Sequence, residues 1–355
     1  MGMIHGTQMK LAGRVVAATV AGAIGLAAGA VRLRRRARRI DLAGRVVVVT
    51  GGGRGFGYAI AREFLRHGCK LAIGSRDGET IARATADFRL HGADVFGMAC
   101  DASDPLQVRD FIAAVLERFG GIDILVNNAG QVFFGPAAEL HPDDLESAMR
   151  NIFWTHYRPT MAVLPYMRAR GFGRIVNITS LAGKVPLPHH GAYVAGKHAA
   201  TGWSETLAIE LRKDGILVST ITPPALNDGA PLHTHFNGDQ EEEFKWFARA
   251  LTSRWTATST DYAARLVVDA AIHGDRQRAV SPGSWLLSRL HGLAPSLMTH
   301  FWSRFDRHLP PPGPPGTLTK MHLGTEVLAD SPDGEVQARG EAARLDARRY
   351  RPPGS

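Results

Sequence analysis

Short apolar runs alternate with longer helical stretches from residue 41 onward. Runs with the length and residue types of strands lie at 45–50, 70–75, 94–100, 123–128, 173–179 and 216–222. Strands that are apolar at nearly every position are buried on both faces, as in a parallel sheet covered by helices on either side. The pattern therefore predicts an α/β fold, a single doubly wound parallel-sheet domain whose ligand crevice lies at the carboxyl ends of its strands.

An uncharged segment of seventeen residues, Val15 to Val31, precedes this pattern. As a helix it spans about 25 Å, slightly short of a hydrocarbon core, and arginines at both ends can extend to make up the difference. Three interpretations stay open: a membrane helix, which we favour, a signal peptide cleaved near Ala28–Ala30, and a soluble helix. Six arginines between 32 and 39 favour a membrane anchor with the bulk of the chain facing the cytoplasm.

Two glycines in this segment, Gly25 and Gly29, form a G-x-x-x-G step. Such a step can pair two membrane helices in a homodimer, although chance explains it as well in so Ala- and Gly-rich a segment. A homodimer stays open on this basis.

The net charge of +9 is concentrated at the start of the chain. Eight basic residues and no acidic residue precede Asp41, so the remainder carries only +1. Basic charge confined to one end argues against a nucleic-acid-binding domain. Cys69 and Cys100 are isolated from each other and from any C-x-x-C spacing, which argues against a disulfide framework or a zinc cluster and fits a reducing compartment. With 355 residues and 45% hydrophobic content, the chain can bury a full core.

The first predicted strand ends in a glycine-rich turn, "TGGGRGFG", Thr50 to Gly57. Glycines at such a turn let the backbone approach a pyrophosphate, and the following helix directs its N-terminal amides at the negative charge. At the end of the second strand Arg76 is placed to bind a 2′-phosphate, and Arg54 adds a second guanidinium. We therefore favour NADP(H) over NAD(H), with Asp77 as the residue that argues against this choice.

A tyrosine stands four residues before a lysine in "GAYVAGKHAA". Tyr193 and Lys197 lie on one helical face at this spacing, and a cation near a phenol lowers the pKa of that phenol. Most isolated pairs of this kind are surface residues without a function, so the interpretation depends on the rest of the chain.

The order of these motifs resembles the short-chain dehydrogenase/reductase family over residues 41–285. Thr50-Gly51, Gly55 and Gly57 resemble its cofactor turn, Asp101 the acid that contacts the adenine, and residues 127–130, "NNAG", the motif that closes the fourth strand. Asn151, Ser180, Tyr193 and Lys197 resemble its catalytic tetrad, with the serine thirteen residues before the tyrosine. The resemblance implies a Rossmann fold and an oxidoreductase that acts on alcohol or carbonyl groups.

The turn and the resemblance together indicate a set of cofactor-binding residues. It comprises Thr50, Gly51, Arg54, Gly55, Phe56, Gly57, Ser75, Arg76, Asp101, Ala102, Asn128, Ala129, Gly130, Tyr193, Lys197 and Pro223. One departure from the family pattern follows the sixth strand, where "PPALND" places Pro224 and Asp228 at positions usually held by glycine and threonine.

The catalytic roles follow from the chemistry of carbonyl reduction. Ser180 is expected to hydrogen-bond a substrate carbonyl while Tyr193 donates the proton that neutralises the alkoxide. Lys197 is expected to lower the pKa of Tyr193 and to hold the nicotinamide ribose. By the resemblance, Asn151 holds a water that links the lysine to solvent.

The remaining sequence predicts extensions to this domain. Residues 286–316 have apolar positions at helical spacing, which indicates core packing or a lid over the substrate entrance, or else an interfacial membrane contact through Trp285, Phe301 and Trp302. Residues 317–355 have low hydrophobicity and mixed charge, so we expect them to be disordered. The histidines of "PHH" (188–190) and "HTH" (233–235) lack supporting acids or cysteines, so we expect no metal site.

The expected organisation is a membrane anchor with its arginine-rich flank (1–40), the Rossmann catalytic domain (41–285), an amphipathic extension (286–316) and a tail (317–355). The anchor and the extension resemble the membrane-anchored hydroxysteroid and retinol dehydrogenases, which favours a lipophilic alcohol or ketone as substrate. Fold does not select the substrate. A 3-oxoacyl-thioester reductase and a non-catalytic, membrane-tethered nucleotide sensor or scaffold stay open as alternatives.

Overall fold

The computed structural model of the protein describes residues 29–252, 257–314, 316 and 318–352. Within them, one seven-stranded sheet is parallel throughout and has the order β3-β2-β1-β4-β6-β7-β9. Its strands are β1 (Val46–Thr50), β2 (Lys70–Ser75), β3 (Val95–Ala99), β4 (Ile124–Asn127), β6 (Gly173–Ile178), β7 (Ile216–Thr222) and β9 (Gln277–Ala279). Six of these confirm the predicted strands, and β9 is an addition at the edge.

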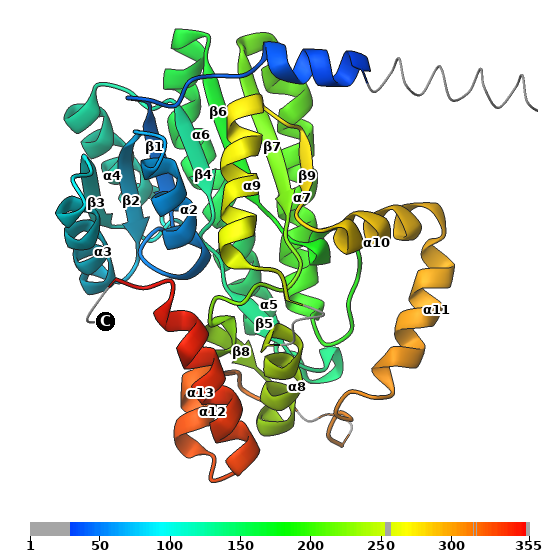
Figure 1. Ribbon diagram of the computed structural model, residues 1–355. Coiled ribbons are helices and arrows are strands. Elements are labelled where there is room, and N and C mark those ends of the chain that lie inside the picture. Colours follow the sequence, from blue (N-terminus) through cyan, green and yellow to red (C-terminus); the bar gives the residue numbers. More distant parts are fainter. Residues whose placement is uncertain (1–28, 253–256, 315, 317, 353–355) are drawn as a thin grey trace, which may run out of the picture.

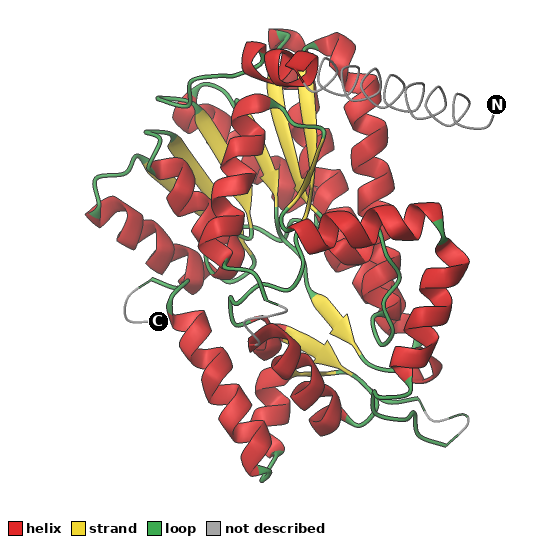
Figure 2. Cartoon of the chain, turned by 45° about the vertical axis from the view of Figure 1, so that its right-hand side comes forward, coloured by secondary structure: helices red, strands yellow, loops and turns green. Residues whose placement is uncertain are grey.

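Helices cover both faces of this sheet (Figures 1 and 2). One face packs against α2 (Gly55–Leu65), α3 (Gly78–Leu90) and α9 (Thr260–His273), and the other against α4 (Pro105–Phe119), α6 (Thr155–Arg170) and α7 (Gly191–Glu210). Every residue of β1 is buried, as a strand covered on both sides requires. The predicted doubly wound fold is confirmed, and the strand order reverses between β1 and β4, which opens a crevice at their carboxyl ends.

A second, three-stranded sheet lies beyond those carboxyl ends and was not predicted. It has the order β10-β8-β5, from β5 (Val132–Phe134), β8 (Thr234–Phe236) and β10 (His322–Leu323). Around it lie α5 (Pro142–Met149), α8 (Gln240–Thr252), α12 (Gly324–Asp330) and α13 (Gly334–Arg348) (Figure 1). Short helical turns complete the chain at Ala137–Glu139, Arg150–Trp154, Leu181–Gly183, Leu211–Asp214 and Ala230–His233.

The prediction of disorder for residues 317–355 is wrong for the part that the structure describes. There α12 and α13 are regular helices that pack on α8 and bury Val327, Leu328 and Val336. The buried face of α13 also consists of small residues, Gly340, Ala343 and Ala347. Because small residues pack closely but add little hydrophobicity, a segment of low average hydrophobicity still forms part of the core.

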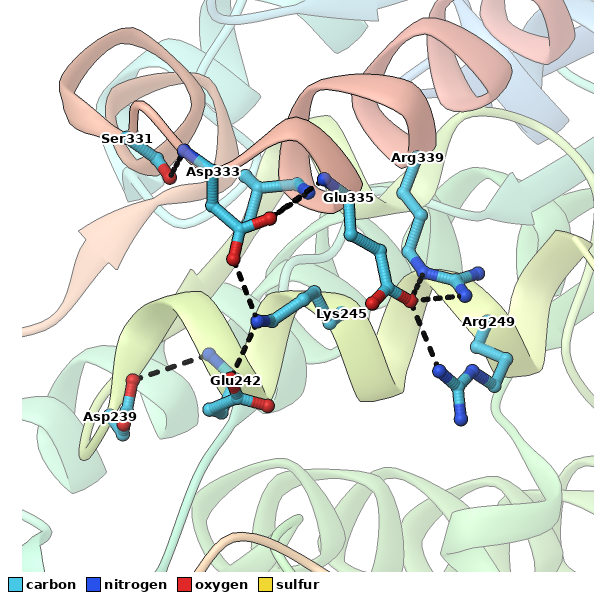
Figure 3. A network of polar contacts seen from close by, with 9 residues as sticks. Asp239, Glu242, Lys245, Arg249, Ser331, Asp333, Glu335 and Arg339 are labelled. Carbon is cyan, nitrogen blue, oxygen red and sulfur yellow. Dashed lines mark hydrogen bonds and ion pairs between the residues drawn. The ribbon is translucent and has the colours of Figure 1, made fainter.

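An ion-pair network fastens α13 to α8 (Figure 3). Lys245 Nζ lies 3.0 Å from Asp333 and 2.5 Å from Glu242, and Arg249 lies 3.0 Å from Glu335. Asp333 also caps the N-terminus of α13 by accepting from two backbone amides. The charges that suggested disorder in the sequence therefore join two helices.

Two helices form the expected amphipathic extension, α10 (Pro282–Leu293) and α11 (Pro295–Asp306), with Pro295 opening the second. Trp302 and Phe305 of α11 line the cavity described below, which favours the lid interpretation for that part of the extension. Trp285 and Phe301 are each 54% exposed, so the same helices also present an apolar surface to the outside.

Most of the predicted membrane segment, residues 15–28, lies outside the described residues. None of the helices that the structure describes is long and apolar enough to cross a membrane. Residues 29–37 are helical, and Arg35 forms ion pairs with Asp275, at 2.9 Å, and with Asp269. Asp275 stands just before β9, so the arginine-rich flank lies at the amino edge of the sheet, opposite the crevice (Figure 1).

Candidate active site

A cavity of about 600 Å³ opens at the carboxyl ends of the parallel strands. It extends from the glycine-rich turn to the second sheet. With one exception, the predicted catalytic and cofactor-binding residues line it: Gly51, Arg54, Gly55, Phe56, Gly57, Ser75, Arg76, Asp101, Ala102, Asn128, Ala129, Gly130, Asn151, Ser180, Tyr193, Lys197 and Pro223. The exception is Thr50, which is buried beneath the cavity.

The glycine-rich turn has the backbone shape that its sequence indicates. Gly51 and Gly55 have φ angles of 68° and 56°, in the region that favours glycine. A Cβ added to Gly57 would lie 2.0 Å from the carbonyl oxygen of Gly51. Any residue larger than glycine would therefore prevent α2 from packing this closely against the turn. This backbone cradle at the start of α2 fits the pyrophosphate of a dinucleotide.

Thr50 and Asn128 join the glycine-rich turn to the end of β4. The Thr50 hydroxyl accepts hydrogen bonds from the backbone amides of Asn128, at 3.0 Å, and Ala129, at 3.1 Å. In return the Asn128 side chain donates to the carbonyl of Thr50 at 3.1 Å. These contacts hold two walls of the crevice together, so Thr50 acts as a positioning residue.

The end of β2 carries one charged residue that faces the cavity and one that does not. Arg76 donates to the side-chain oxygen of Asn151 at 3.2 Å, which places its guanidinium across the crevice. Asp77 instead caps α3 by accepting from the amides of Glu79, at 3.0 Å, and Thr80. These hydrogen bonds, led by that of the Thr80 hydroxyl, lower the pKa of Asp77.

Ser180 and Tyr193 meet at the floor of the cavity. Ser180 follows β6, and its hydroxyl hydrogen-bonds the phenol oxygen of Tyr193, which stands in the first turn of α7. The Ser180 oxygen also accepts from the amide of Ala182 at 3.1 Å, so the serine is held in place. A carbonyl placed here would contact two hydroxyl groups, as proton transfer to its oxygen requires.

Lys197 lies one turn below the tyrosine on the same face of α7. Its ammonium is 5.7 Å from the centroid of the Tyr193 ring and donates to the carbonyl of Ile178 at 2.9 Å. Asn151 sits in a π-helical turn, Arg150–Trp154, where wide backbone turns often mark functional sites. Its backbone oxygen and the Lys197 ammonium both lie within 4 Å of the position that a Cβ on Gly130 would take.

The expected effect of Lys197 on Tyr193 is not found in this structure. Burial raises the pKa of Tyr193 to about 12, the hydrogen bond from Ser180 opposes this shift, and the negative charge of Asp228 adds to it. Burial lowers the pKa of Lys197 to about 7. Lys197 is not among the groups that shift the pKa of Tyr193 here, so its lowering effect on the phenol stays a prediction, and burial is the largest influence on that pKa.

Asp228, the departure from the family pattern, lies between the glycine-rich turn and Tyr193. Its carboxylate accepts hydrogen bonds from the backbone amides of Phe56 and of Ala230, the latter at 3.1 Å. Burial raises the pKa of Asp228 to about 6. The ionised Asp228 carboxylate thus binds a backbone amide at the N-terminus of α2, where an anionic ligand would also bind.

Beyond Tyr193 the cavity walls are mainly apolar and aromatic. The residues come from β5, α8, α11 and the loops around them: Val132, Phe134, Leu187, Trp246, Phe247, Leu251, Trp302, Phe305 and Leu309. Sequence reasoning did not assign most of these, because helical periodicity does not distinguish a cavity wall from a core face. Arg351, which also lines the cavity, was missed because no motif marks it.

The histidines considered for a metal site have other contacts. His189 pairs with buried Glu243 at 2.8 Å, and His235 stacks on Phe133. His233 lies 2.9 Å from a guanidinium nitrogen of Arg54. In the part of the chain that the structure describes, no three metal-ligating side chains come together.

Comparison with known proteins places this geometry among dinucleotide-dependent enzymes. A family model described as short chain dehydrogenase matches residues 45–238. A dehydrogenase/reductase SDR family protein 7-like protein of Anopheles gambiae is 36% identical over 206 residues, which are 56% of this chain and 64% of the relative. The chain thus matches less than two thirds of this relative's length.

Two solved structures extend the similarity. A short chain dehydrogenase/reductase from Burkholderia phymatum in complex with NAD is 27% identical, with a TM-score of 0.67, covering 73% of this chain and 96% of that one. An actinorhodin polyketide ketoreductase with NADPH is 28% identical, with a TM-score of 0.60, covering 68% and 97%. The two neighbours carry different nicotinamide cofactors, so similarity alone does not select one.

Proposed function

The chain belongs to the short-chain dehydrogenase family, and from this premise we propose that it is an NADP(H)-dependent oxidoreductase that interconverts an alcohol and a carbonyl on a lipophilic substrate. The observation that carries the proposal is the Ser180–Tyr193 pair, which stands between a dinucleotide cradle and an apolar chamber in one cavity. The residues of the cradle would hold a nicotinamide dinucleotide, which would supply or accept the hydride.

The chain's own residues divide the remaining chemistry. Ser180 holds the carbonyl oxygen of the substrate, and Tyr193 donates the proton that this oxygen takes up. A phenol with a pKa of about 12 is protonated at neutral pH, as the proton donor in carbonyl reduction must be. Lys197, beneath the phenol, provides positive charge and a route for reprotonation that passes near Asn151.

Support for NADP(H) comes from the charges at the adenosine end of the cavity. Arg54 and Arg76 line it with two guanidinium groups, which bind phosphate in a bidentate manner. Asp77, the residue that argued for NAD(H), has its carboxylate engaged at the N-terminus of α3. The acid is thereby less available to a ribose hydroxyl.

A lipophilic substrate fits the aromatic walls formed by Phe134, Trp246, Phe247, Trp302 and Phe305. The alternative of a 3-oxoacyl-thioester reductase is favoured by one observation, the similarity to a polyketide ketoreductase. A non-catalytic sensor or scaffold has less support, because Ser180, Tyr193 and Lys197 line one cavity.

The proposal is tested by following NADPH and NADH consumption with a panel of lipophilic ketones, using the Tyr193→Phe variant as the probe. This change removes the proton donor alone, so we expect turnover to fall by about 10²–10⁴-fold while the Kd for NADPH stays within a few-fold. The rate with NADPH should exceed that with NADH. Wild-type turnover retained by Tyr193→Phe would refute the catalytic assignment.

We also propose that residues 15–31 anchor the protein in a membrane with the catalytic domain in the cytoplasm. The support comes from the sequence, the uncharged segment and its arginine flank. The full chain should resist carbonate extraction from membranes, whereas a chain starting at Asp41 should be released. A mature N-terminus just after Ala30 would contradict the anchor and indicate a signal peptide.

A further inference from the structure

Three guanidinium groups line the part of the cavity near the glycine-rich turn. Arg54 belongs to the turn itself, Arg76 follows β2, and Arg351 follows α13 at the far end of the chain. Among residues 29–252, 257–314, 316 and 318–352, none of the three takes part in an ion pair within 4.0 Å. Positive charge is therefore concentrated here without a carboxylate in direct contact.

Arg54 and Arg351 share a neutral acceptor. A guanidinium nitrogen of Arg54 lies 2.5 Å from Nε2 of His233, and one of Arg351 lies 3.4 Å from the same atom. Burial first, and then the charges of Arg54 and Arg351, lower the pKa of His233 to about 3. The imidazole is thus uncharged and does not balance the two cations.

Arg351 and Arg76 are close enough to Arg54 for their charges to lower its pKa. The surroundings of Arg54 lower its pKa, and after burial the next causes are the charges of Arg351 and then Arg76. Asp77 and Asp228 act in the opposite direction, but each contributes less. The uncompensated positive charge of this cavity wall favours binding of an anion.

The fold fixes Arg351 in this position. Its neighbour Tyr350 is only 3% exposed, packs in the core formed by α2 and α9, and accepts at its carbonyl the amide proton of Gly55 at 2.8 Å. The preceding helix, α13, is joined to α8 by the ion pairs of Figure 3. Arg351 is thus held near the glycine-rich turn by the residues that precede it.

We propose that Arg351 binds a phosphate group of the dinucleotide together with Arg54, so that the C-terminal segment supplies part of the cofactor site. The inference rests on the proposed function, because it takes the ligand to be NADP(H) or NAD(H). Guanidinium binds phosphate oxygens in pairs, and the amides at the start of α2 lie beside the same space. Both the pyrophosphate and the 2′-phosphate offer this chemistry.

The test compares Arg351→Gln with a matched control, Arg349→Gln. Arg349 stands two residues away and its side chain is 66% exposed; among the residues that the structure describes, it pairs with Asp346 alone and does not line the cavity. The Kd values for NADPH and NADH are measured by quenching of tryptophan fluorescence, with Tm as the check on folding. We expect Arg351→Gln to raise the Kd for NADPH by about tenfold or more and Arg349→Gln to leave it unchanged.

The two cofactors identify the phosphate that is bound. Weaker binding of NADPH alone indicates the 2′-phosphate, whereas equal weakening of NADPH and NADH indicates the pyrophosphate. Arg351→Lys keeps the charge but loses the paired geometry, so it should recover part of the affinity. Its partial recovery would separate loss of charge from a change in the fold.

Two results would overturn the inference. Equal Kd values for Arg351→Gln and Arg349→Gln would show that Arg351 does not contact the cofactor, and tighter binding in Arg351→Gln would show that the C-terminal segment obstructs the site. In both cases the wild-type protein still binds, so the proposed function stands. Failure of the wild-type protein to bind either dinucleotide would refute the proposed function and the inference with it.

Discussion

The parallel sheet and the C-terminal cap, which we define as α8, α12, α13 and the β10-β8-β5 sheet, are stabilised in different ways. The sheet buries contiguous apolar strands between two layers of helices, and its core residues come mainly from strands and helices that alternate along residues 42–280. The cap gathers its core from distant segments, including Phe134, Phe236, Phe247, Leu328 and Ala343. Its helices are also joined by ion pairs at the surface.

This difference separates two contributions to the site. The sheet supplies the glycine-rich turn, Ser180 and the end of β4, whose positions follow from strand geometry. The cap supplies Phe134, Trp246 and Phe247 of the aromatic walls and leads to Arg351, while α11 adds Trp302 and Phe305. On the proposed function, the sheet thus provides Ser180 and, with Arg54 and Arg76, most of the phosphate-binding groups, whereas the cap adds apolar walls and the segment that leads to Arg351. Stability changes in the cap should therefore alter binding more than folding.

The largest effect that tests this comparison is expected from a pair of leucine substitutions. Leu125 of β4 and Leu328 of α12 are both almost completely buried, and Leu→Ala at such sites lowers the free energy of unfolding by about 2–5 kcal/mol. Leu125→Ala should shift the main denaturation transition. Leu328→Ala should instead raise amide hydrogen exchange in the cap and weaken NADPH binding, with little change in the main transition.

The result that would break the comparison is a single shared transition. If Leu328→Ala and Leu125→Ala shifted the same cooperative transition equally, with uniform exchange throughout, the cap and the sheet would be one cooperative unit. The division of roles between them would then have no basis in stability.

The sheet was predictable from sequence because local pattern determines it. The expected strand 45–50 corresponds to Val46–Thr50, and 216–222 corresponds to Ile216–Thr222, since a strand buried on both faces is apolar at nearly every position. The short strand β9 (Gln277–Ala279) was not predicted, because two of its three residues are polar and it lies at the edge of the sheet. The glycine-rich turn was predictable for a similar reason, because positive φ angles require glycine.

The cap was not predictable from sequence, because its polar and small residues form helices and a core only through contacts with distant parts of the chain. The face of α13 that contacts Leu328 includes Gly340, where an added Cβ would lie 2.2 Å from a leucine methyl. A glycine in a polar segment suggests disorder in the sequence, yet here it permits close packing. Arg351 shows the same limit, since nothing in the sequence relates it to a turn some 300 residues earlier.

The second prediction concerns the point at which the two regions meet, Asp228. Its pKa is raised to about 6, so the carboxylate is ionised above that pH and neutral below it. The charged and titratable groups that face it are Arg54, Tyr193 and Asp346. Because the ionised form repels the cofactor phosphates, the affinity for NADH should fall roughly three- to tenfold as the pH rises through about 6.

Asp228→Asn is the matched variant for this test, since it keeps the shape and removes the charge. It should bind NADH more tightly at pH 7 and lose the pH dependence near 6. NADH is the better probe because it lacks the 2′-phosphate, which itself titrates. The cavity histidines His190 and His233 have pKa values of about 4 and about 3, so they stay neutral in this range. An unchanged pH profile in Asp228→Asn would assign the effect to another group.

The smallest expected effect concerns the ion pairs that join α13 to α8. Glu335→Gln removes the charge that contacts Arg249 at 3.0 Å and Arg339 at 2.6 Å, and these arginines, Arg339 first, lower the pKa of Glu335. The pairs are exposed, so we expect a slightly lower Tm at low ionic strength and no difference at about 1 M salt, where charges are screened within a few ångströms. The pKa of Glu335 is lower in the folded than in the unfolded protein, so its ion pairs stabilise the fold at neutral pH. This stabilisation is lost as the pH falls through the pKa of the folded carboxyl. The Tm values of Glu335→Gln and wild type should therefore converge in acid.

Glu341→Gln provides the control, because Glu341 lies on the same helix and, among the described residues, forms an ion pair within that helix alone, with Arg344 at 3.6 Å. A bond within α13 does not join two elements, so its loss should leave both the Tm and the Kd for NADPH unchanged. Glu335→Gln, in contrast, loosens the attachment of the helix that leads to Arg351 and should weaken NADPH binding slightly at low salt. Identical Tm and Kd values for the two variants would show that the ion pairs of Figure 3 contribute nothing measurable to stability or binding. Apolar packing around Leu328 alone would then hold the cap in place.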